Sequence, residues 1–438
     1  MNSQVFNFRI IPSVVKADAE TTITIRPLGK NVAFQAGETY TVQIRGVETA
    51  CDDYRELPTA EYAVTPNEQG DLQVTHLFAG EQKHIVYVIR PESDLSSPYR
   101  DVTYRPKYGQ NTNATLAVYS LYPDLYGMRC YKGEVHCHTY ASDGIEDIPH
   151  TVANYRAAGY DFLAITDHYI SYGSEQAKAL FDHTALPMTL FLGEEVHVPQ
   201  ERIHAVHLGG KASVNAYYRE HPEEVKAQVE ELMATLDLPE NVSKINYAWQ
   251  KWSADKSREM GGLAILAHPH WVWNDVYFMA ESVTRQLLCD GVYDALDLRD
   301  TEVDTSLSLW QDVCLQGHTI PVVGSTDAHY TAPYDPKVPA KGGYTLVFAP
   351  DRSEQKLMDA IRENRSLCVS TDHTPEFVMG PYRLVKLGRF MLDYFFPYHM
   401  WLSAGFGPLV SEYSPDKEPM METLAEQSEA FMKEFYGY

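Results

Sequence analysis

The 438-residue sequence predicts an α/β fold with an all-β domain before it and a helical segment after it. Residues 1–128 contain short runs of alternating apolar and polar residues, a pattern typical of a β-sandwich. From residue 129, short apolar strands alternate with helical patterns, as in a βα barrel or a layered sheet. Residues 375–438 are aromatic and have helical spacing. Because a domain usually has about 100–200 residues, this length suits two or three domains.

The first region, 1–128, holds four segments that we expect to be strands: 21–25, 40–44, 72–75 and 84–89. Glycine, asparagine and proline separate these segments at short intervals, as between the strands of a sandwich. Residues 91–112 are polar and contain prolines, so we expect a long loop there.

The second region, 129–374, contains the apolar runs of a barrel or layered sheet. We expect strands at 133–138, 162–166, 189–192, 203–208, 263–267, 295–298 and 320–324. One helix should begin with Asp147 as its cap and end before Gly159, and another should begin near Ser353. Apolar residues at helical spacing in 211–260 predict a helical insertion between two strands. Such insertions often serve as lids or specificity elements.

The third region, 375–438, repeats apolar residues at i, i+3 and i+4, as in Leu384, Leu387 and Met391. Pro397 should kink or end this helical segment. We expect a C-terminal subdomain that packs on the barrel. A helix lying on a membrane surface is disfavoured, because the apolar face lacks a companion basic face.

The composition excludes several classes of protein. The formal net charge is −24, with 60 acidic and 36 basic residues, which argues against a protein that binds nucleic acid through its phosphates. The N-terminus lacks the features of a signal peptide, and no apolar run is long enough to cross a membrane. The six cysteines are scattered and are expected to stay thiols. We therefore expect a cytoplasmic protein.

Histidines and carboxylates recur where the predicted strands end. They are His136, His138, Asp143, Asp167, His168, Glu194, Glu195, His204, His207, His268, Asp327 and His329. Because residues i and i+2 of a strand point to the same side, His136 and His138 should enter one cavity, with Cys137 packed in the opposite layer. Imidazole and carboxylate groups hold zinc, manganese or iron. The set is too large for one tetrahedral ion, so we expect two or three divalent metal ions.

The ordered motifs HxH, D, TDH, GxE, H, AHP and DxH resemble the PHP (polymerase and histidinol phosphatase) superfamily of metal-dependent hydrolases over residues 130–330. The resemblance implies a trinuclear metal cluster in a distorted (β/α)7 barrel, with Glu195 as the bridging carboxylate. The ligands that it implies are His136, His138, Asp143, His168, Glu195, His204, His268, Asp327 and His329. The β domain and helical tail more loosely resemble the carbaryl hydrolase-like branch.

Two ligand positions have competing neighbours. Only one of Glu194 and Glu195 can face the cavity, and the GxE spacing selects Glu195. His204 and His207 compete for one role, and the spacing to Leu208-Gly209 favours His204. His207 could instead contact the substrate or support a ligand.

Other polar residues near these motifs are candidates for proton transfer or substrate binding. Asp167, His207 and His270 could protonate the leaving group, although Asp167 could orient a ligand imidazole and His270 could simply pack beside its neighbour. Arg299, and after it Arg202, could bind a substrate phosphate; a surface ion pair is an equal alternative for either.

The sequence thus predicts a phosphoesterase that cleaves a small phosphorylated substrate with a metal-bridging hydroxide. One alternative is a hydrolase of a carbamate, amide or ester. Another is a non-catalytic module that binds metal and a partner. No nucleic-acid or membrane partner is expected, while the aromatic tail could seal a homo-oligomer.

Overall fold

The computed structural model describes residues 3–48, 51, 58–89, 112–197, 204–298, 303–331, 342–372 and 374–438. The chain divides into two compact units. The first comprises Met1–Met128, Arg389–Trp401 and Glu426–Tyr438, and the second comprises Arg129–Gly388 and Leu402–Ala425. The C-terminal helices thus contribute to both units. The predicted division at 128 and 374 into three domains stays a prediction.

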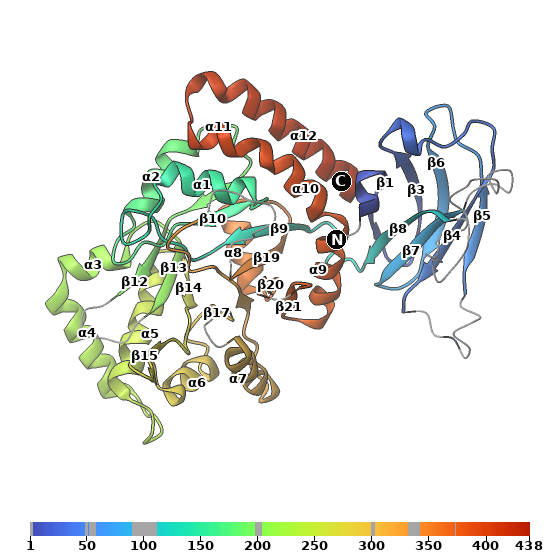
Figure 1. Cartoon of the computed structure of the whole chain (residues 1–438). Helices are drawn as coiled ribbons and strands as arrows, with labels where there is room; N and C mark the ends of the chain where they lie inside the picture. The colour runs from blue at the N-terminus through green and yellow to red at the C-terminus, as the bar shows by residue number, and fades with distance from the viewer. Residues whose placement is uncertain are drawn as a thin grey trace. The chain divides into compact units, whose positions relative to one another are not determined.

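The first unit contains two β-sheets (Figure 1). One has the order β1-β3-β6 and the other β2-β8-β7-β4-β5. The strands are β1 (Phe8–Ile11), β2 (Val14–Lys16), β3 (Ala19–Pro27), β4 (Tyr40–Gly46), β5 (Ala60–Val64), β6 (Leu72–Phe78), β7 (Lys83–Ile89) and β8 (Thr112–Leu121). All four predicted strands lie within β3, β4, β6 and β7, which confirms them. Of the predicted loop at 91–112, residues 91–111 lie outside the described residues, and the prediction is wrong at Thr112, which is the first residue of β8.

The core of this unit follows the alternation that the sequence predicts. Ile23 and Ile25 of β3 and Val86 and Val88 of β7 are fully buried, while their sequence neighbours are more exposed. Short 3-10 helices occur at Ser3–Phe6 and Lys30–Val32.

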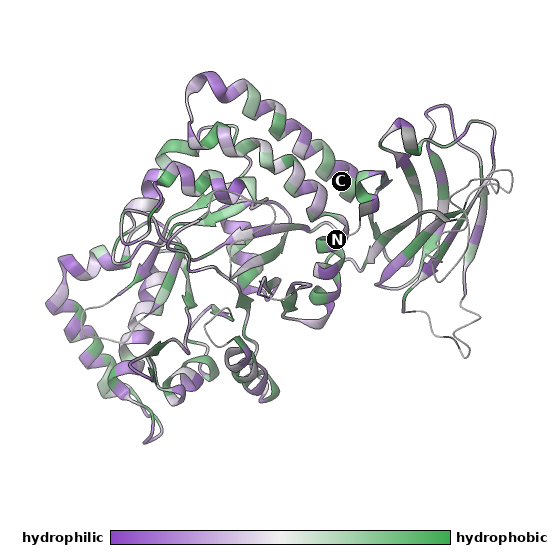
Figure 2. Cartoon of the chain, viewed as in Figure 1, coloured by the Kyte–Doolittle hydropathy of each residue, from purple (hydrophilic) through white to green (hydrophobic). Residues whose placement is uncertain are grey.

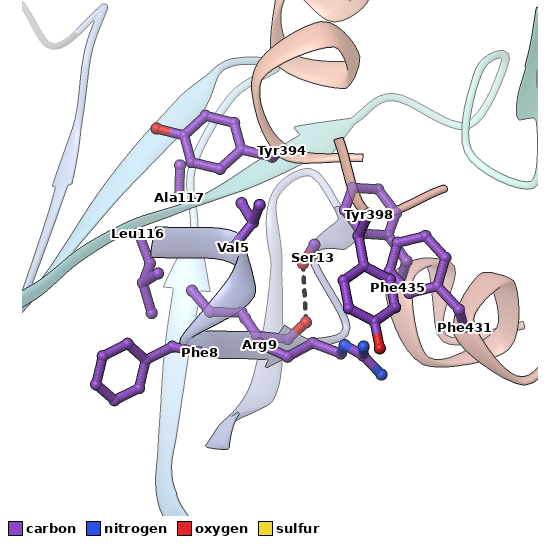
Figure 3. Close-up of a pocket in the computed structure, with 11 residues that line it drawn as sticks. Val5, Phe8, Arg9, Ser13, Leu116, Ala117, Tyr394, Tyr398, Phe431 and Phe435 are labelled. Atoms are coloured by element: carbon purple, nitrogen blue, oxygen red, sulfur yellow. Dashed lines mark hydrogen bonds between the residues drawn. The ribbon is translucent and has the colours of Figure 1, made fainter. Parts of the chain in front are cut away.

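A small cavity of about 30 Å³ lies within this unit, lined by β1, β8 and parts of the C-terminal helices (Figure 3). The guanidinium of Arg9 lies over the rings of Tyr398 and Phe431, at 4.5 and 5.1 Å from their centroids, and pairs with Glu434. This space suits about one water molecule, so we attribute the cavity to packing.

The second unit contains a six-stranded sheet, β11-β10-β9-β19-β20-β21, a five-stranded sheet, β12-β13-β14-β17-β18, and the hairpin β15-β16. The strands are β9 (Arg129–Glu134), β10 (Phe162–Ala164), β11 (Thr189–Phe191), β12 (Gly193–Val196), β13 (Ala205–Gly209), β14 (Gly262–Leu266), β15 (Val272–Trp273), β16 (Val276–Tyr277), β17 (Ala295–Asp297), β18 (Val322–Val323), β19 (Gly343–Ala349), β20 (Ser366–Ser370) and β21 (Phe377–Met379). β13, β14 and β19 are wholly buried, and apolar residues, green in Figure 2, recur in the strands of this unit.

Two isolated β-bridges connect the six-stranded and five-stranded sheets. Cys137 pairs with Ala328, and His168 pairs with Glu195. Each bridge joins a segment that follows a strand of the six-stranded sheet to a segment of the five-stranded sheet. The sheets therefore meet at the residues that carry the predicted ligands. A closed seven-stranded barrel stays a prediction.

Strand direction within the five-stranded sheet differs from a uniformly parallel arrangement. β13 runs antiparallel to both β12 and β14, while β14, β17 and β18 are parallel. The amino end of β13 therefore lies beside the carboxyl end of β14, with Ala205 opposite Leu266. This direction determines where His204 lies.

Helices flank the sheets of the second unit (Figure 1). They are α1 (Ile148–Ala157), α2 (Tyr172–Phe181), α3 (Val214–Glu220), α4 (Pro222–Thr235), α5 (Lys244–Glu259), α6 (Glu281–Cys289), α7 (Val303–Leu315) and α8 (Glu354–Arg362). The predicted insertion is confirmed as α3–α5, and α5 packs on β13 and β14. The predicted cap is confirmed too, since the carboxylate of Asp147 accepts a hydrogen bond from the His150 amide.

The C-terminal helices are α9 (Tyr382–Tyr394), α10 (Phe396–Ser403), α11 (Gly407–Ser411) and α12 (Glu418–Tyr436). The predicted apolar face is confirmed by Leu384, Leu387 and Met391, which are buried. α9 ends just before Pro397, which sits in the first turn of α10, where a proline is tolerated. Of the helices described, none has the length and apolar character needed to cross a bilayer. All six cysteines are free thiols.

A buried arginine links α1 to the last residue of α10. The guanidinium of Arg156 donates to the Tyr160 carbonyl (2.8 Å), to Asp161 Oδ1 (3.1 Å) and to Ser403 Oγ (2.9 Å). Both charged side chains are almost completely buried. Such a pair is costly to break because it leaves one charge in an apolar environment.

We expect Arg156→Met to lower the free energy of unfolding by about 3–5 kcal/mol, because it leaves the Asp161 carboxylate without its guanidinium. Urea unfolding followed by circular dichroism measures the effect. As a control, Arg285→Met removes an exposed ion pair with Asp312 and should cost less than about 1 kcal/mol. Equal losses in the two variants would contradict the importance of burial.

Candidate metal centre

The HxH segment lies directly after β9, at the edge where the two sheets meet. His136 and His138 are both buried, and their ring centroids are 5.2 Å apart. The Nε2 atoms of the two rings lie 3.4 and 3.0 Å from Asp327 Oδ1. The same two atoms lie 3.3 and 3.6 Å from Glu195 Oε2. Both imidazoles thus face the same two carboxylates, and Cys137 is buried with its thiol directed to the Ala164 carbonyl. The predicted strand at 133–138 was wrong beyond Glu134, because β9 ends there and the HxH segment follows it.

Glu195 of β12 lies at the centre of the cluster. Its Oε2 atom is 2.8 Å from His168 Nδ1. Its Oε1 atom is 3.1 Å from His204 Nδ1, 3.3 Å from His197 Nε2 and 3.4 Å from His268 Nε2. The two oxygens of one carboxylate thus face different imidazole sets, which is the arrangement that a bridging ligand needs.

A further group of donors surrounds Asp143. Its carboxylate lies 3.5 Å from His168 Nε2, 3.4 Å from His329 Nε2 and 4.0 Å from His138 Nδ1. The Asp143 side chain is 56% exposed, whereas those of His136 and Glu195 are 1% exposed. The cluster is therefore closed on the Glu195 side and open to solvent on the Asp143 side.

The donor atoms form several groups that could each hold a cation. In four groups, one donor atom per residue lies within 4.8 Å of all the others. These groups are His138–Asp143–His168–His329, His136–His138–Asp327, His136–Glu195–His268 and His168–Glu195–His197. His204 Nδ1 is additionally 3.3 Å from His268 Nε2, beside the same Glu195 oxygen. Because some residues belong to two of these groups, the groups describe neighbouring metal positions, in keeping with two or three ions.

Several buried donor atoms lack the hydrogen bonds that a protein interior normally supplies. Among the residues that the structure describes, both ring nitrogens of His136, Nδ1 of His138 and both oxygens of Glu195 have no hydrogen-bond partner. Unsatisfied buried polar atoms are costly and rare. The lone pairs of these imidazoles and carboxylates converge, and no hydrogen-bond donor satisfies them. This arrangement fits divalent cations well.

The charges of the cluster shift its pKa values strongly. Burial would lower the pKa of His136, but the carboxylates of Asp327 and Glu195 outweigh it and raise this pKa to about 10. Burial would raise the pKa of Glu195, but the charge of His136 and its contacts with neighbouring imidazoles hold this pKa well below its usual range. Burial lowers the pKa of His204 to about 4. When no cation is bound, the protonated imidazole of His136 thus supplies the positive charge that balances the neighbouring carboxylates.

Glu134 fixes the backbone on which two of these ligands sit. Its buried carboxylate accepts hydrogen bonds from the amides of Val135 and His136, both at 3.0 Å, and of Thr326 at 3.1 Å. Burial raises the pKa of Glu134 to about 8. The Asp327 amide in turn donates to the His136 carbonyl at 2.9 Å. Glu134 therefore holds the HxH segment and the segment after β18 together.

The structure distinguishes the two adjacent glutamates. Glu194 accepts hydrogen bonds from Ser213 Oγ (2.6 Å) and Asn215 Nδ2 (2.9 Å) at the amino end of α3, away from the cluster. Glu195 faces the imidazoles, as the alternation along β12 requires.

Strand direction separates His204 from His207. His204 precedes β13 at the edge where β14 ends, so it meets His268 and Glu195. His207 lies farther along β13, opposite Ala264, and donates to the Ala212 carbonyl at 3.2 Å. Burial lowers the pKa of His207 to about 4.

The remaining predicted site residues contact protein or lie outside the described residues. Asp167 accepts hydrogen bonds from the Thr139 amide and from Ser142 Oγ, both at 2.8 Å, and so holds the loop that leads to Asp143. His270 Nδ1 lies 2.7 Å from Ser306 Oγ. The proton-transfer roles of Asp167, His207 and His270 stay predictions. Arg202 and Arg299 lie outside the described residues, so their substrate-binding role stays a prediction too.

His197 belongs to the cluster but was not among the predicted ligands. It lies 3.3 Å from Glu195 Oε1 and 3.0 Å from His168 Nδ1. Its amide donates to Asn215 Oδ1 at 3.0 Å, which fixes the end of β12. The sequence carried the signal, because His197 is at i+2 from Glu195, the spacing that relates His136 to His138.

No family model and no curated protein matches this sequence. Several solved structures are similar to parts of it. A two-domain protein from Bacteroides vulgatus containing a predicted PHP-like metal-dependent phosphoesterase has 17% identity and a TM-score of 0.44, covering 62% of this chain and 72% of its own. A structure described as a metal-dependent phosphoesterase from Bifidobacterium adolescentis has 17% identity and a TM-score of 0.33, covering 47% and 89%. An amidohydrolase from Chromobacterium violaceum has 17% identity and a TM-score of 0.32, covering 46% and 88%.

We expect His138→Ala and Asp327→Ala each to reduce the bound metal by at least one ion per chain, because each removes a donor at the centre of the cluster. Mass-spectrometric elemental analysis of the purified variants measures the metal. His207→Ala is the matched control, since its ring contacts Ala212 and not the cluster. Full metal content in both cluster variants would contradict this set of ligands.

Metal binding to metal-free protein should release about one proton even at pH 8. A histidine with an ordinary pKa of about 6.5 is already neutral there, whereas His136 keeps its proton up to a pKa of about 10. A metal needs the neutral imidazole, so binding displaces this proton. Calorimetric titration with Mn²⁺ in two buffers of different ionisation enthalpy counts the protons. Binding heats that do not depend on the buffer would contradict the raised pKa.

Proposed function

We propose that this protein is a metal-dependent hydrolase, and more specifically a phosphoesterase that cleaves a small phosphorylated substrate. The observation that carries the proposal is the converging set of imidazoles and carboxylates around Glu195, which is buried at Glu195 and open to solvent at Asp143. Clustered divalent ions are a device for hydrolysis, whereas a structural site is usually closed by its protein ligands.

The ions would be held by His136, His138, Asp143, His168, Glu195, His204, His268, Asp327 and His329, with His197 beside them. When bound, they would supply Lewis acidity and an activated water molecule. Zinc, manganese and iron all suit this mixture of donors. A phosphate ester is the favoured substrate, because its anionic oxygens match a local positive charge despite the chain's net charge of −24.

The chain's own residues would orient the reaction. Glu134 holds the backbone of His136 and Thr326, so that two ligand segments keep their separation. Asp167 holds Thr139 and Ser142, and therefore the loop that carries Asp143 at the open side. Such supporting contacts fix ligand orientation and strengthen metal binding. The exposed Asp143 and His329 mark the side from which a substrate can approach.

The test is hydrolysis of a panel of phosphate monoesters, phosphate diesters, carbamates and carboxylic esters by protein loaded separately with zinc, manganese and iron. We expect turnover of phosphate esters that a chelator abolishes and added metal restores. Glu195→Gln should lower kcat/KM by more than about 100-fold, because removal of even a supporting partner costs about 10–100-fold. His221→Ala is the control, because its exposed ring pairs with Glu224 and it is neither a predicted ligand nor a predicted proton-transfer group.

Turnover of carbamates or carboxylic esters alone would replace the phosphoesterase proposal with the alternative hydrolase. Metal binding without turnover of any class would favour the non-catalytic module.

A further inference from the structure

Tyr169 adopts a backbone conformation that its bulk disfavours. It directly follows His168 and has φ of +66°, in the left-handed region. Glycine and asparagine enter this region readily, whereas a bulky aromatic residue there is uncommon. Such conformations gather at functional sites, where the surrounding structure enforces them.

Neighbouring elements hold the Tyr169 backbone from both sides. Its amide donates to the Glu195 carbonyl at 3.3 Å. Its carbonyl accepts a hydrogen bond from the guanidinium of Arg219 on α3. These contacts involve only the peptide groups of Tyr169, so a glycine would satisfy them with less strain. The reason for a tyrosine must therefore lie in its side chain.

The ring of Tyr169 borders the donor cluster without being buried. Its centroid lies 4.6 Å from that of His197 and 6.3 Å from that of His168, and both histidines contact Glu195. The residue is 51% exposed. Burial of apolar surface thus accounts for only part of this placement, and one side of the ring remains available to a molecule at the open edge.

Other exposed apolar side chains lie close in sequence to the ligands. Tyr140 follows His138 by two residues, and Tyr330 follows His329 directly. Ile145 follows Asp143 by two residues, and Tyr172 is the first residue of α2, three residues after Tyr169. The Ile145 amide donates to the His329 carbonyl at 2.8 Å, which joins the segments that carry these two residues. Together with Tyr169, we call these residues the apolar rim: Tyr140, Ile145, Tyr169, Tyr172 and Tyr330.

We propose that Tyr169 is a substrate-contact residue that packs against a ring in the leaving group, either a planar aryl ring or the apolar face of a cyclic sugar, so that the preferred substrates are phosphate esters of phenols or of cyclic sugars. This inference rests on the proposed function, since it names the substrate class of the same site. Aromatic side chains stack on planar rings and on the apolar faces of sugars, and each such contact commonly changes affinity by about 10-fold or more. The other rim residues would contact the same group more peripherally.

The experiment compares metal-loaded wild type, Tyr169→Gly and Tyr169→Phe on phenyl phosphate, glucose 1-phosphate and butyl phosphate. Tyr169→Gly should lower kcat/KM about 10-fold or more for the substrates with a ring, mainly through KM, and leave butyl phosphate unchanged. Tyr169→Phe keeps the ring and should retain the activity. A larger loss on phenyl phosphate would identify an aryl group, and a larger loss on glucose 1-phosphate a sugar.

Thermal unfolding separates this role from a structural one. Because glycine accepts φ of +66°, Tyr169→Gly should keep or raise the unfolding midpoint while losing the ring substrates. Asn364→Gly is the matched control, a residue with φ of +57° at the end of α8. It should change neither kcat/KM nor metal content. A lowered midpoint with reduced metal in Tyr169→Gly, or an equal loss on all three phosphates, would overturn the proposal.

Binding of phenylphosphonate, which cannot be hydrolysed, keeps this test independent of turnover. Calorimetry should give an affinity about 10-fold weaker for Tyr169→Gly than for wild type. If no phosphate ester is hydrolysed but this difference appears, the phosphoesterase proposal fails while the ring contact stands. Equal affinities, or no binding to either protein, would reject the ring contact.

Discussion

The site depends on one buried carboxylate. Glu195 lies in β12 with both oxygens inside the protein, and within about 3.4 Å it meets imidazoles from separate segments of the chain, including His136, His168 and His204. An ionised carboxylate is unstable in an apolar interior unless positive charge surrounds it. Either protons on the imidazoles or divalent cations must supply that charge. The raised pKa of His136 means that a proton on this imidazole supplies positive charge, and the same geometry allows a cation to replace that proton.

The backbone brings these side chains together before any side-chain contact is considered. The two isolated bridges, Cys137–Ala328 and His168–Glu195, join the six-stranded and five-stranded sheets at the ligand segments themselves. Each bridge therefore does two things: it connects the sheets and sets the spacing between ligands on opposite sides of the junction. Glu134 adds a third connection through the Thr326 amide. The contacts that join the two sheets of the second unit are therefore also the contacts that position the ligands.

Local patterns in the sequence predicted the features that depend on local geometry. Strand alternation placed His136 and His138 on one side and Cys137 on the other, and the cap at Asp147 followed from side-chain chemistry. The direction of β13 could not be predicted, because apolar alternation identifies the buried face but not the partner's direction. That direction explains why His204 meets the cluster and His207 does not. His197 was predictable from its i+2 relation to Glu195, although none of the motifs that carry the family resemblance includes it.

The strained residues show how the chain prepares the site in advance. Three non-glycine residues with positive φ lie at this edge: Tyr169 at +66°, His268 at +24° and Asp327 at +47°. Each such conformation costs about 1–3 kcal/mol and persists only where surrounding contacts enforce it. Here the enforcing contacts are the backbone hydrogen bonds of the sheet junction, such as that from the Asp327 amide to the His136 carbonyl. These strained conformations form when the second unit folds, so their free-energy cost is part of the free energy of folding. It does not reduce the free energy of the later binding of cations or substrate. A flexible site with the same donors would bear that cost at every binding event.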